Sequence, residues 1–148
     1  MITSERQLIE DLTLSLFHFL EEDKGFNFGT IIKRDSKKHI GMFEVILYRR
    51  SHLGVRIHLD FFEMLAYITL VPLINGTYPD VPFGSRTSWG FAEYLQKKLG
   101  ITDPMWEEIR ALNTQPNREV PYFQAILALY RDFVLKYIDV VNSADMAD

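Results

Sequence analysis

Cysteine is absent from the chain, and this absence excludes several kinds of chemistry. Without thiols the protein has no disulfide bond, no thiolate nucleophile, no iron–sulfur cluster and no cysteine-ligated zinc. Long apolar runs are also missing: the longest, residues 64–74, is about half of the ~20 residues that a membrane-spanning helix needs. The first residues are polar and charged, unlike a secretory signal. We therefore expect a cytoplasmic protein without membrane contact.

The familiar short motifs of catalysis are missing as well. The sequence contains no glycine-rich phosphate loop, no His-Glu-x-x-His pair and no Gly-x-Ser-x-Gly elbow. Because no motif points to a particular reaction, the sequence implies no cofactor and leaves open whether the protein is an enzyme. The formal net charge of −4 argues mildly against nucleic-acid binding by the chain as a whole.

The residues that are present are typical of a globular domain. A chain of 148 residues can bury most of its surface in one core. Hydrophobic residues make up 47% and charged residues 24%, which is an ordinary globular mixture. No repeat or linker divides the chain, so we expect a single α+β domain over residues 1–141. Residues 142–148 are expected to form a flexible C-terminal tail.

Helical spacing of apolar residues predicts one helix before and three helices after a central alternating segment. The first begins at a capping box formed by Ser4 and Gln7 and ends before Gly25. The three later helices are expected from Thr87 or Ser88 to Leu99, from the Asp103-Pro104 pair onward, and from Val120 to Val141.

The central segment, residues 26–72, alternates between apolar and polar residues, which predicts strands. Four strands are expected, at residues 26–33, 42–50, 55–62 and 64–71. Short turns separate them, so neighbouring strands should be antiparallel. The sequence therefore predicts an α+β fold: an N-terminal helix, a four-stranded antiparallel meander, and three C-terminal helices packed on one face of the sheet.

The hydrophobic pattern also predicts how the second and third strands pair. Placing Phe43 opposite Phe61 and Val45 opposite Leu59 keeps these apolar residues on the core side. The other face would then carry five polar or ionisable residues at neighbouring positions: Glu44, Tyr48, Arg56, His58 and Asp60.

Three interpretations of this polar face compete. In the first it is the solvated outer face of an antiparallel sheet, with Arg56 lying over Tyr48. In the second, Glu44 is a general base, His58 a general acid and Arg56 a phosphate clamp for metal-free cleavage of RNA. In the third, Glu44, His58 and Asp60 bind a metal, although one histidine without cysteine makes a poor transition-metal site. We expect the first, and no metal site.

Basic and acidic residues are unevenly distributed. Residues 33–58, called the basic segment here, hold seven basic and two acidic residues, a net charge of +5. The remainder holds nine basic and eighteen acidic residues, a net charge of −9. Any contact with nucleic acid is therefore expected at the basic segment only. The acidic residues lie on the expected helices, where they would suit a cationic protein partner.

Aromatic and charged residues that look exposed are the candidates for partner contacts. Tyr78 and Phe83 lie in a long connection punctuated by glycine and proline. Trp106 stands beside two carboxylates, although we expect it to anchor its short helix to the core. The residues expected to bind a partner are Tyr78, Phe83, Arg49, Arg50, Glu107 and Glu108.

The segment Gly-Val-Arg-Ile-His-Leu-Asp at residues 54–60, between two apolar strands, resembles a pattern in small bacterial proteins. These are single-domain α+β families, several of which are immunity proteins of polymorphic toxin systems. The resemblance implies a protein that binds and blocks a toxin without catalysing a reaction. It transfers no individual site residue, and Phe61-Phe62-Glu63 stands where a tighter polar turn would be expected.

Two main hypotheses follow. The leading one is a non-enzymatic cytoplasmic protein-binding domain of bacterial or phage type, an immunity protein that neutralises a toxin. The alternative is a small metal-independent ribonuclease or RNA-binding domain that uses Glu44, Arg56 and His58. A structural or oligomeric role, with the loop from Tyr78 to Phe83 as the contact, and the oligomeric state stay open. The deciding observation is whether the face bearing Arg56 and His58 is exposed or covered.

Overall fold

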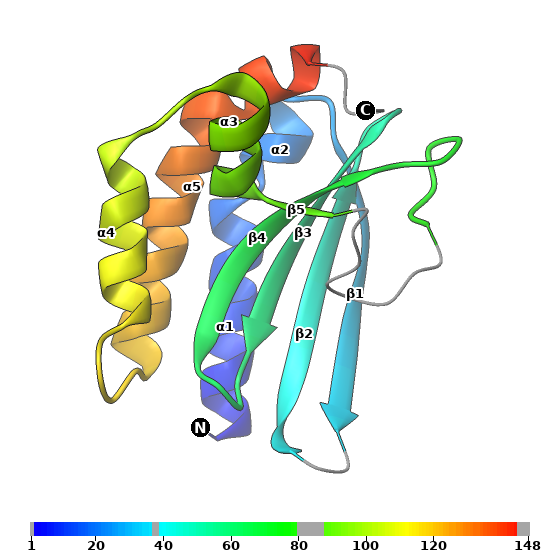
Figure 1. The fold of residues 1–148 in the computed structure, drawn as a ribbon. Helices are drawn as coiled ribbons and strands as arrows, with labels where there is room; N and C mark the ends of the chain where they lie inside the picture. Colours follow the sequence, from blue (N-terminus) through cyan, green and yellow to red (C-terminus); the bar gives the residue numbers. More distant parts are fainter. Residues whose placement is uncertain (1, 37–38, 80–87, 145–148) are drawn as a thin grey trace.

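Helices and strands follow one another in the computed structural model, which describes residues 2–36, 39–79 and 88–144 (Figure 1). The helices are α1 (Thr3–Leu16), α2 (Phe19–Glu22), α3 (Phe91–Leu99), α4 (Pro104–Asn113) and α5 (Val120–Ser143). The strands are β1 (Asn27–Ser36), β2 (His39–Arg49), β3 (Leu53–Asp60), β4 (Leu65–Pro72) and β5 (Trp89–Gly90). The predicted α+β class, with an N-terminal helix, an antiparallel sheet and C-terminal helices, is confirmed.

The strands of the described residues form one antiparallel sheet in the order β1-β2-β3-β4-β5, so every strand pairs with its neighbours in the chain. The predicted number of four strands is wrong, because the short strand β5, Trp89 and Gly90, adds to the free side of β4. β5 leads directly into α3, and Gly90 is the N-cap of that helix instead of Ser88. The other expected cap, Thr87, lies outside the described residues.

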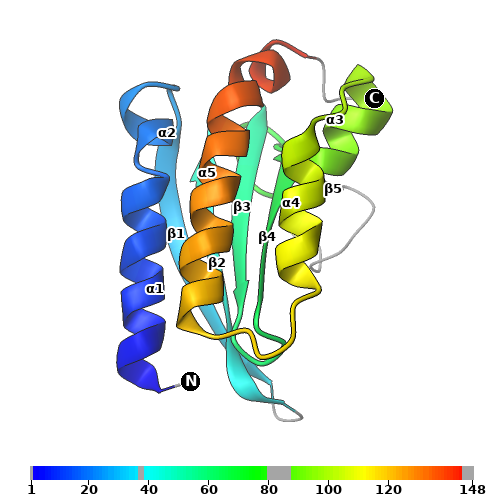
Figure 2. The same cartoon turned by 90° about the vertical axis from the view of Figure 1, so that its left-hand side faces the viewer.

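The long helices cover one face of the sheet. Figure 2 shows α5 in the middle of this layer, with α1 on one side and α4 on the other. Helix α3 lies beside β4 and β5 at one end of the molecule (Figure 1). The helix layer therefore brings together α1 and α5, two elements from opposite parts of the chain. Every helix of the described residues is too short or too polar to span a lipid bilayer.

Helix boundaries follow some of the expected local signals and not others. Asp103 is the N-cap of α4: its carboxylate accepts a hydrogen bond of 2.8 Å from the backbone N–H of Met105, and Pro104 is the first helical residue. The capping box at Ser4 does not form, since the N-cap of α1 is Ile2, two residues earlier, and no side chain caps the helix. The expected first helix also divides into α1 and α2.

The core lies between the helix layer and one face of the sheet. From β3, Val55, Ile57 and Leu59 are fully buried in it. The apolar residues by which α5 was predicted are buried, except for the half-buried Tyr137: Phe123, Ile126, Leu127, Tyr130, Val134, Ile138 and Val141. This helix continues to Ser143, so residues 142 and 143, which were predicted to belong to a tail, are helical; residues 145–148 lie outside the described part.

Arg118, in the link between α4 and α5, holds the β3–β4 turn in place. Its guanidinium donates hydrogen bonds to the carbonyls of Met64 (2.8 Å) and Glu63 (3.1 Å) in that turn. It also donates to the carbonyls of Asn113 (3.0 Å) and Gln115 (2.7 Å) at the end of α4. Met64 has a positive φ of 56°, which costs a non-glycine residue on the order of 1–2 kcal/mol. The arginine therefore stabilises a strained turn and joins it to the helix layer.

Candidate functional site

The predicted polar face depends on the register between β2 and β3, and the observed register differs by one residue. Val45 lies opposite His58 instead of Leu59, and Tyr48 lies opposite Val55. Because successive side chains of a strand alternate between the two faces, a shift of one residue exchanges the faces of β2. Tyr48 accordingly lies on the helix side, where its side chain is 1% exposed. The predicted register is wrong.

The five predicted site residues are therefore not brought together. Arg56, His58 and Asp60 share the face of β3 that points away from the core residues of that strand. Tyr48 lies on the other face. Glu44 is opposite Leu59 in the register, and its side chain lies outside the described residues.

Arg56 and His58 form a buried polar layer, with side chains of the neighbouring strand and loop around them. The two residues are only 5% and 3% exposed. Nε2 of His58 lies 3.0 Å from Oγ1 of Thr69, and the imidazole stacks on the ring of Tyr67 with the centroids 4.5 Å apart. The guanidinium of Arg56 lies over the ring of Tyr78, 5.1 Å from its centroid. The expectation of a solvated face therefore does not hold for this pair.

Tyr78 covers part of this polar layer instead of serving as an exposed contact residue. Its hydroxyl lies within hydrogen-bond distance of the backbone carbonyls of Tyr48 and Val55, the latter at 3.0 Å. A Cβ atom added to Gly54 would lie 2.6 Å from the Tyr78 ring, so the glycine makes room for the tyrosine. The second aromatic residue of the predicted contact loop, Phe83, lies outside the described residues.

Burial decides the charge state of the histidine in this layer. Desolvation, assisted by the positive charge of Arg56, lowers the pKa of His58 to about 3. The imidazole is therefore neutral near pH 7, whereas a histidine that acts as a general acid must be an imidazolium at the working pH. Desolvation also lowers the pKa of Arg56 from its usual value. The layer suits internal support of the sheet better than proton transfer.

Asp60 has a local structural role. Its carboxylate accepts hydrogen bonds from the backbone N–H groups of Phe62 (3.0 Å) and Glu63 (2.9 Å) and thereby closes the β3–β4 turn. In the part of the chain that the structure describes, no three histidine, aspartate or glutamate side chains lie together as metal ligands would.

The basic segment uses several of its charges inside the fold. Nζ of Lys33 lies 2.9 Å from the carboxylate of Glu10, a mostly buried residue of α1. Arg50 donates a hydrogen bond of 3.2 Å to the backbone carbonyl of Lys24. Arg49 and Arg50 are nevertheless exposed, as expected for contact residues. The lysines at positions 37 and 38 lie outside the described residues. Part of the positive charge of this segment is therefore engaged within the protein.

The first turn of α4 is tied to α5 by a small polar cluster. The carboxylate of Asp103 lies 2.7 Å from Nζ of Lys136 and accepts a hydrogen bond from the hydroxyl of Tyr137. These contacts, the lysine first, lower the pKa of Asp103 to about 2. The cluster fixes the position of α4 relative to the longest helix.

A shallow groove of about 270 Å³ lies beside this cluster. Its lining residues are Gln96, Thr102, Asp103, Pro104, Trp106 and Glu107. Trp106 is half-buried and packs against the core, as predicted, while Glu107 and Glu108 project into solvent. The side chain of Glu107 is 72% exposed. The groove therefore combines a fixed aromatic side chain with exposed negative charge.

Sequence reasoning missed three residues that complete these arrangements. Thr69 and Tyr67 of β4 lie opposite Arg56 and His58 of β3, in a strand whose other residues are mostly apolar. Pairing β3 with β4 across their short turn would have placed both residues opposite Arg56 and His58. Arg118 had no local signal, because its partners in the turn are more than fifty positions away in the sequence.

Comparisons with known proteins found nothing similar. No protein-family model matches the chain, and no match was found among curated proteins or solved structures. The function therefore has to be inferred from the chemistry and geometry of the chain itself.

Proposed function

We propose that this chain is a non-enzymatic protein-binding domain of the cytoplasm, an immunity protein that neutralises a basic toxin. The observation that carries the proposal is the exposed acidic start of α4, where the half-buried Trp106 is followed directly by the exposed Glu107 and Glu108. Binding hot spots are enriched in tryptophan, and exposed carboxylates around such a residue would accelerate association with a cationic partner.

The surface is also held in place. Asp103 caps α4 and binds Lys136 and Tyr137 on α5, so the groove does not have to be ordered when a partner arrives. The proposed partner chemistry follows from the charge distribution, since the chain outside the basic segment carries a net charge of −9. A basic enzyme such as a nuclease would satisfy it.

The ribonuclease hypothesis has less support. It requires Glu44 and His58 on one face, whereas the register places Glu44 opposite Leu59 on the neighbouring strand. It also requires a protonated histidine, and the pKa of His58 is lowered to about 3. Arg56 is 5% exposed, which leaves little of its guanidinium accessible to a phosphate.

Affinity capture from the source organism, with two charge-reversal variants, tests the proposal. The wild-type chain should retain one partner in stoichiometric amount, and the gene next to its own should encode that partner. Glu107→Lys/Glu108→Lys should weaken the purified complex at least tenfold, because like charges then face each other. The matched control Asp11→Lys/Asp132→Lys changes the net charge equally on α1 and α5 and should retain the partner.

Three results would contradict the proposal in different ways. Absence of any stoichiometric partner would argue against a binding function. Equal binding by both variants would leave a binding protein but would remove α4 as its contact surface. Cleavage of RNA by the purified wild-type chain, lost in His58→Ala, would favour the alternative.

A further inference from the structure

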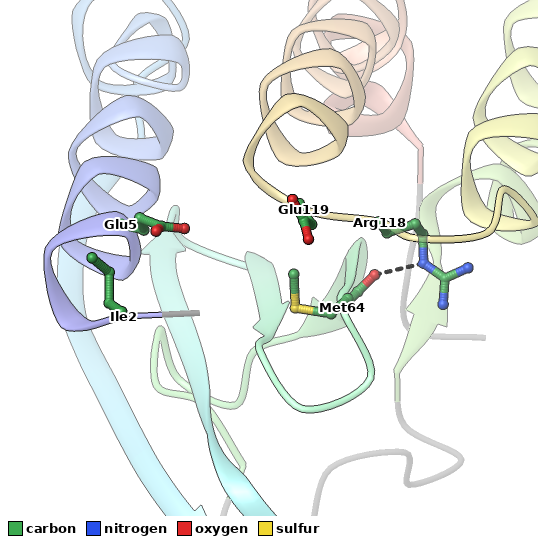
Figure 3. A pocket seen from close by; sticks show the side chains of 5 residues that line it. All are labelled: Ile2, Glu5, Met64, Arg118 and Glu119. Carbon is green, nitrogen blue, oxygen red and sulfur yellow. Dashed lines mark hydrogen bonds between the residues drawn. The ribbon is translucent and has the colours of Figure 1, made fainter.

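We propose that a pocket between the starts of α1 and α5 binds a guanidinium group, the side chain of an arginine presented by a partner protein. The pocket has a volume of about 420 Å³, within the range of small-ligand sites. Five residues line it, Ile2, Glu5, Met64, Arg118 and Glu119 (Figure 3). It lies on elements other than α4 and does not depend on the groove beside Trp106.

Two carboxylates from different helices give the pocket its charge. Glu5 lies in the first turn of α1, and Glu119 is the N-cap residue of α5. Figure 3 shows both side chains directed into the space between the two helices. A planar guanidinium has donors along its edges, so it can hydrogen-bond to two carboxylates at once, which a compact ammonium does less well.

Apolar side chains form the rest of the wall. Ile2 and Met64 lie below the carboxylates in Figure 3, on the α1 and β3–β4 sides of the pocket. Ile2 is 63% exposed, so its apolar surface is accessible to a ligand. The methylene groups of an arginine side chain could pack against these two residues while its head reaches the carboxylates. An inorganic cation would leave this apolar surface in water.

The cation in the lining does not neutralise the pocket. The guanidinium of Arg118 points away from the cavity in Figure 3, and its donors bind backbone carbonyls. One of these hydrogen bonds, to the backbone carbonyl of Met64, holds the turn that carries this part of the wall in place before a ligand enters. A preformed site loses less conformational entropy on binding.

The surroundings of the pocket suit a protein ligand better than a free amino acid. Phe62 and Glu63 lie in the same turn as Met64, and both are exposed. Phe62 is 46% exposed, which offers an aromatic contact to the residues that flank the bound arginine. An anionic ligand is disfavoured, because it would meet the carboxylates of Glu5 and Glu119.

A titration of the isotopically labelled protein with N-acetyl-arginine amide, followed by NMR, tests the inference without any partner. The probe should cause saturable shifts of the backbone amides of Met64 and Glu119, with a Kd on the order of millimolar. N-acetyl-citrulline amide has the same shape without the charge and should bind at least tenfold more weakly.

Two variants locate the site. Glu5→Gln/Glu119→Gln keeps the shape of both side chains, removes both charges, and should weaken arginine binding at least tenfold. Glu107→Gln/Glu108→Gln makes the same chemical change on α4 and should leave the affinity unchanged. Thermal unfolding of both variants serves as the control for folding.

Equal shifts with arginine and citrulline probes would overturn the inference, and this comparison needs only the wild-type chain. Shifts that do not saturate, or an unchanged affinity in Glu5→Gln/Glu119→Gln, would overturn it as well. If Glu107→Lys/Glu108→Lys captured the partner as well as the control variant does, only the proposed function would be contradicted. The small probe reports on this pocket alone.

Discussion

The two faces of β3 are both buried, but they are buried in different ways. On the helix side, Val55, Ile57 and Leu59 are excluded from water by apolar packing. On the other side, Arg56 and His58 are covered by ring stacking and polar contacts with neighbouring strands and with a loop. A polar side of a strand is thus not necessarily an exposed one. Stability on the first face should depend on volume, and on the second face on charge and hydrogen bonding.

The largest effect is expected on the apolar face. Ile57→Ala removes three carbon atoms from a fully buried side chain and should lower the free energy of unfolding by about 2–5 kcal/mol, through lost transfer energy and an unfilled cavity. Ile57→Val, the matched smaller change, should cost about 0.5–1.5 kcal/mol. Urea denaturation monitored by circular dichroism measures both. A cost below 1 kcal/mol for the alanine would mean that this face is loosely packed.

The second effect is a pH dependence that belongs to the polar face. His58 has a pKa of about 3 when folded and of about 6.5 when unfolded, so between these values the unfolded chain binds the additional proton. The contribution of His58 to the free energy of unfolding is fully present above pH 6.5 and is lost as the pH falls toward 3. Between pH 6.5 and 5 the loss should be about 2 kcal/mol.

The matched variants for this pH dependence are two histidine substitutions. His58→Gln should remove the loss between pH 6.5 and 5, whereas His52→Gln, at an exposed position, should retain it. Urea midpoints at the two pH values provide the measurement. An equal loss in wild type and His58→Gln would assign the pH dependence to other groups and would remove the distinction between the faces.

A smaller effect is expected where the loop meets the polar face. Gly54→Ala places a Cβ atom 2.6 Å from the ring of Tyr78, so the tyrosine must shift, at a cost of about 1–2 kcal/mol. If this contact is the cause, Gly54→Ala should cost almost nothing in a Tyr78→Ala background. A double-mutant cycle of unfolding free energies measures the coupling. Additive effects would show that Tyr78 does not pack on this glycine.

The smallest effect is expected on α4. Glu107→Gln/Glu108→Gln changes two exposed carboxylates and should alter the free energy of unfolding by no more than about 0.5 kcal/mol. The same urea measurement applies. A loss above 1 kcal/mol would mean that these charges support the fold, which would weaken their assignment to partner binding.

The order and antiparallel pairing of β1 to β4 could be predicted from the sequence. Which side chains of β2 point toward the helix layer could not. The alternation of Val55, Ile57 and Leu59 identifies the core side of β3 correctly. In β2, Ile46 and Leu47 are both buried although they point to opposite faces, so hydrophobicity does not distinguish the two registers. The turn decides between them: it is closed by a hydrogen bond of 2.8 Å between the N–H of Arg50 and the carbonyl of Leu53, without a glycine or proline to mark it.

The candidate sites depend still more on contacts between distant residues. Gly54 lies inside β3 and makes room for Tyr78, but the predicted strand began at residue 55, and the sequence does not indicate which group approaches the glycine. Glu5 and Glu119 are more than a hundred positions apart, and only the packing of α1 beside α5 brings them into one pocket. Local patterns therefore predicted the elements, whereas the sites required tertiary structure.

The position of α5 in the middle of the helix layer has a consequence for synthesis on the ribosome. All residues of β1 to β4 have been polymerised when Pro72 is added, but the helix that covers their apolar face begins only at Val120. At roughly 5–20 residues per second, the nascent chain carries for several seconds a hydrophobic sheet surface that α5 does not yet cover. Completion of the core must therefore wait for the last helix, and during that interval the emerging chain is a natural client for chaperones.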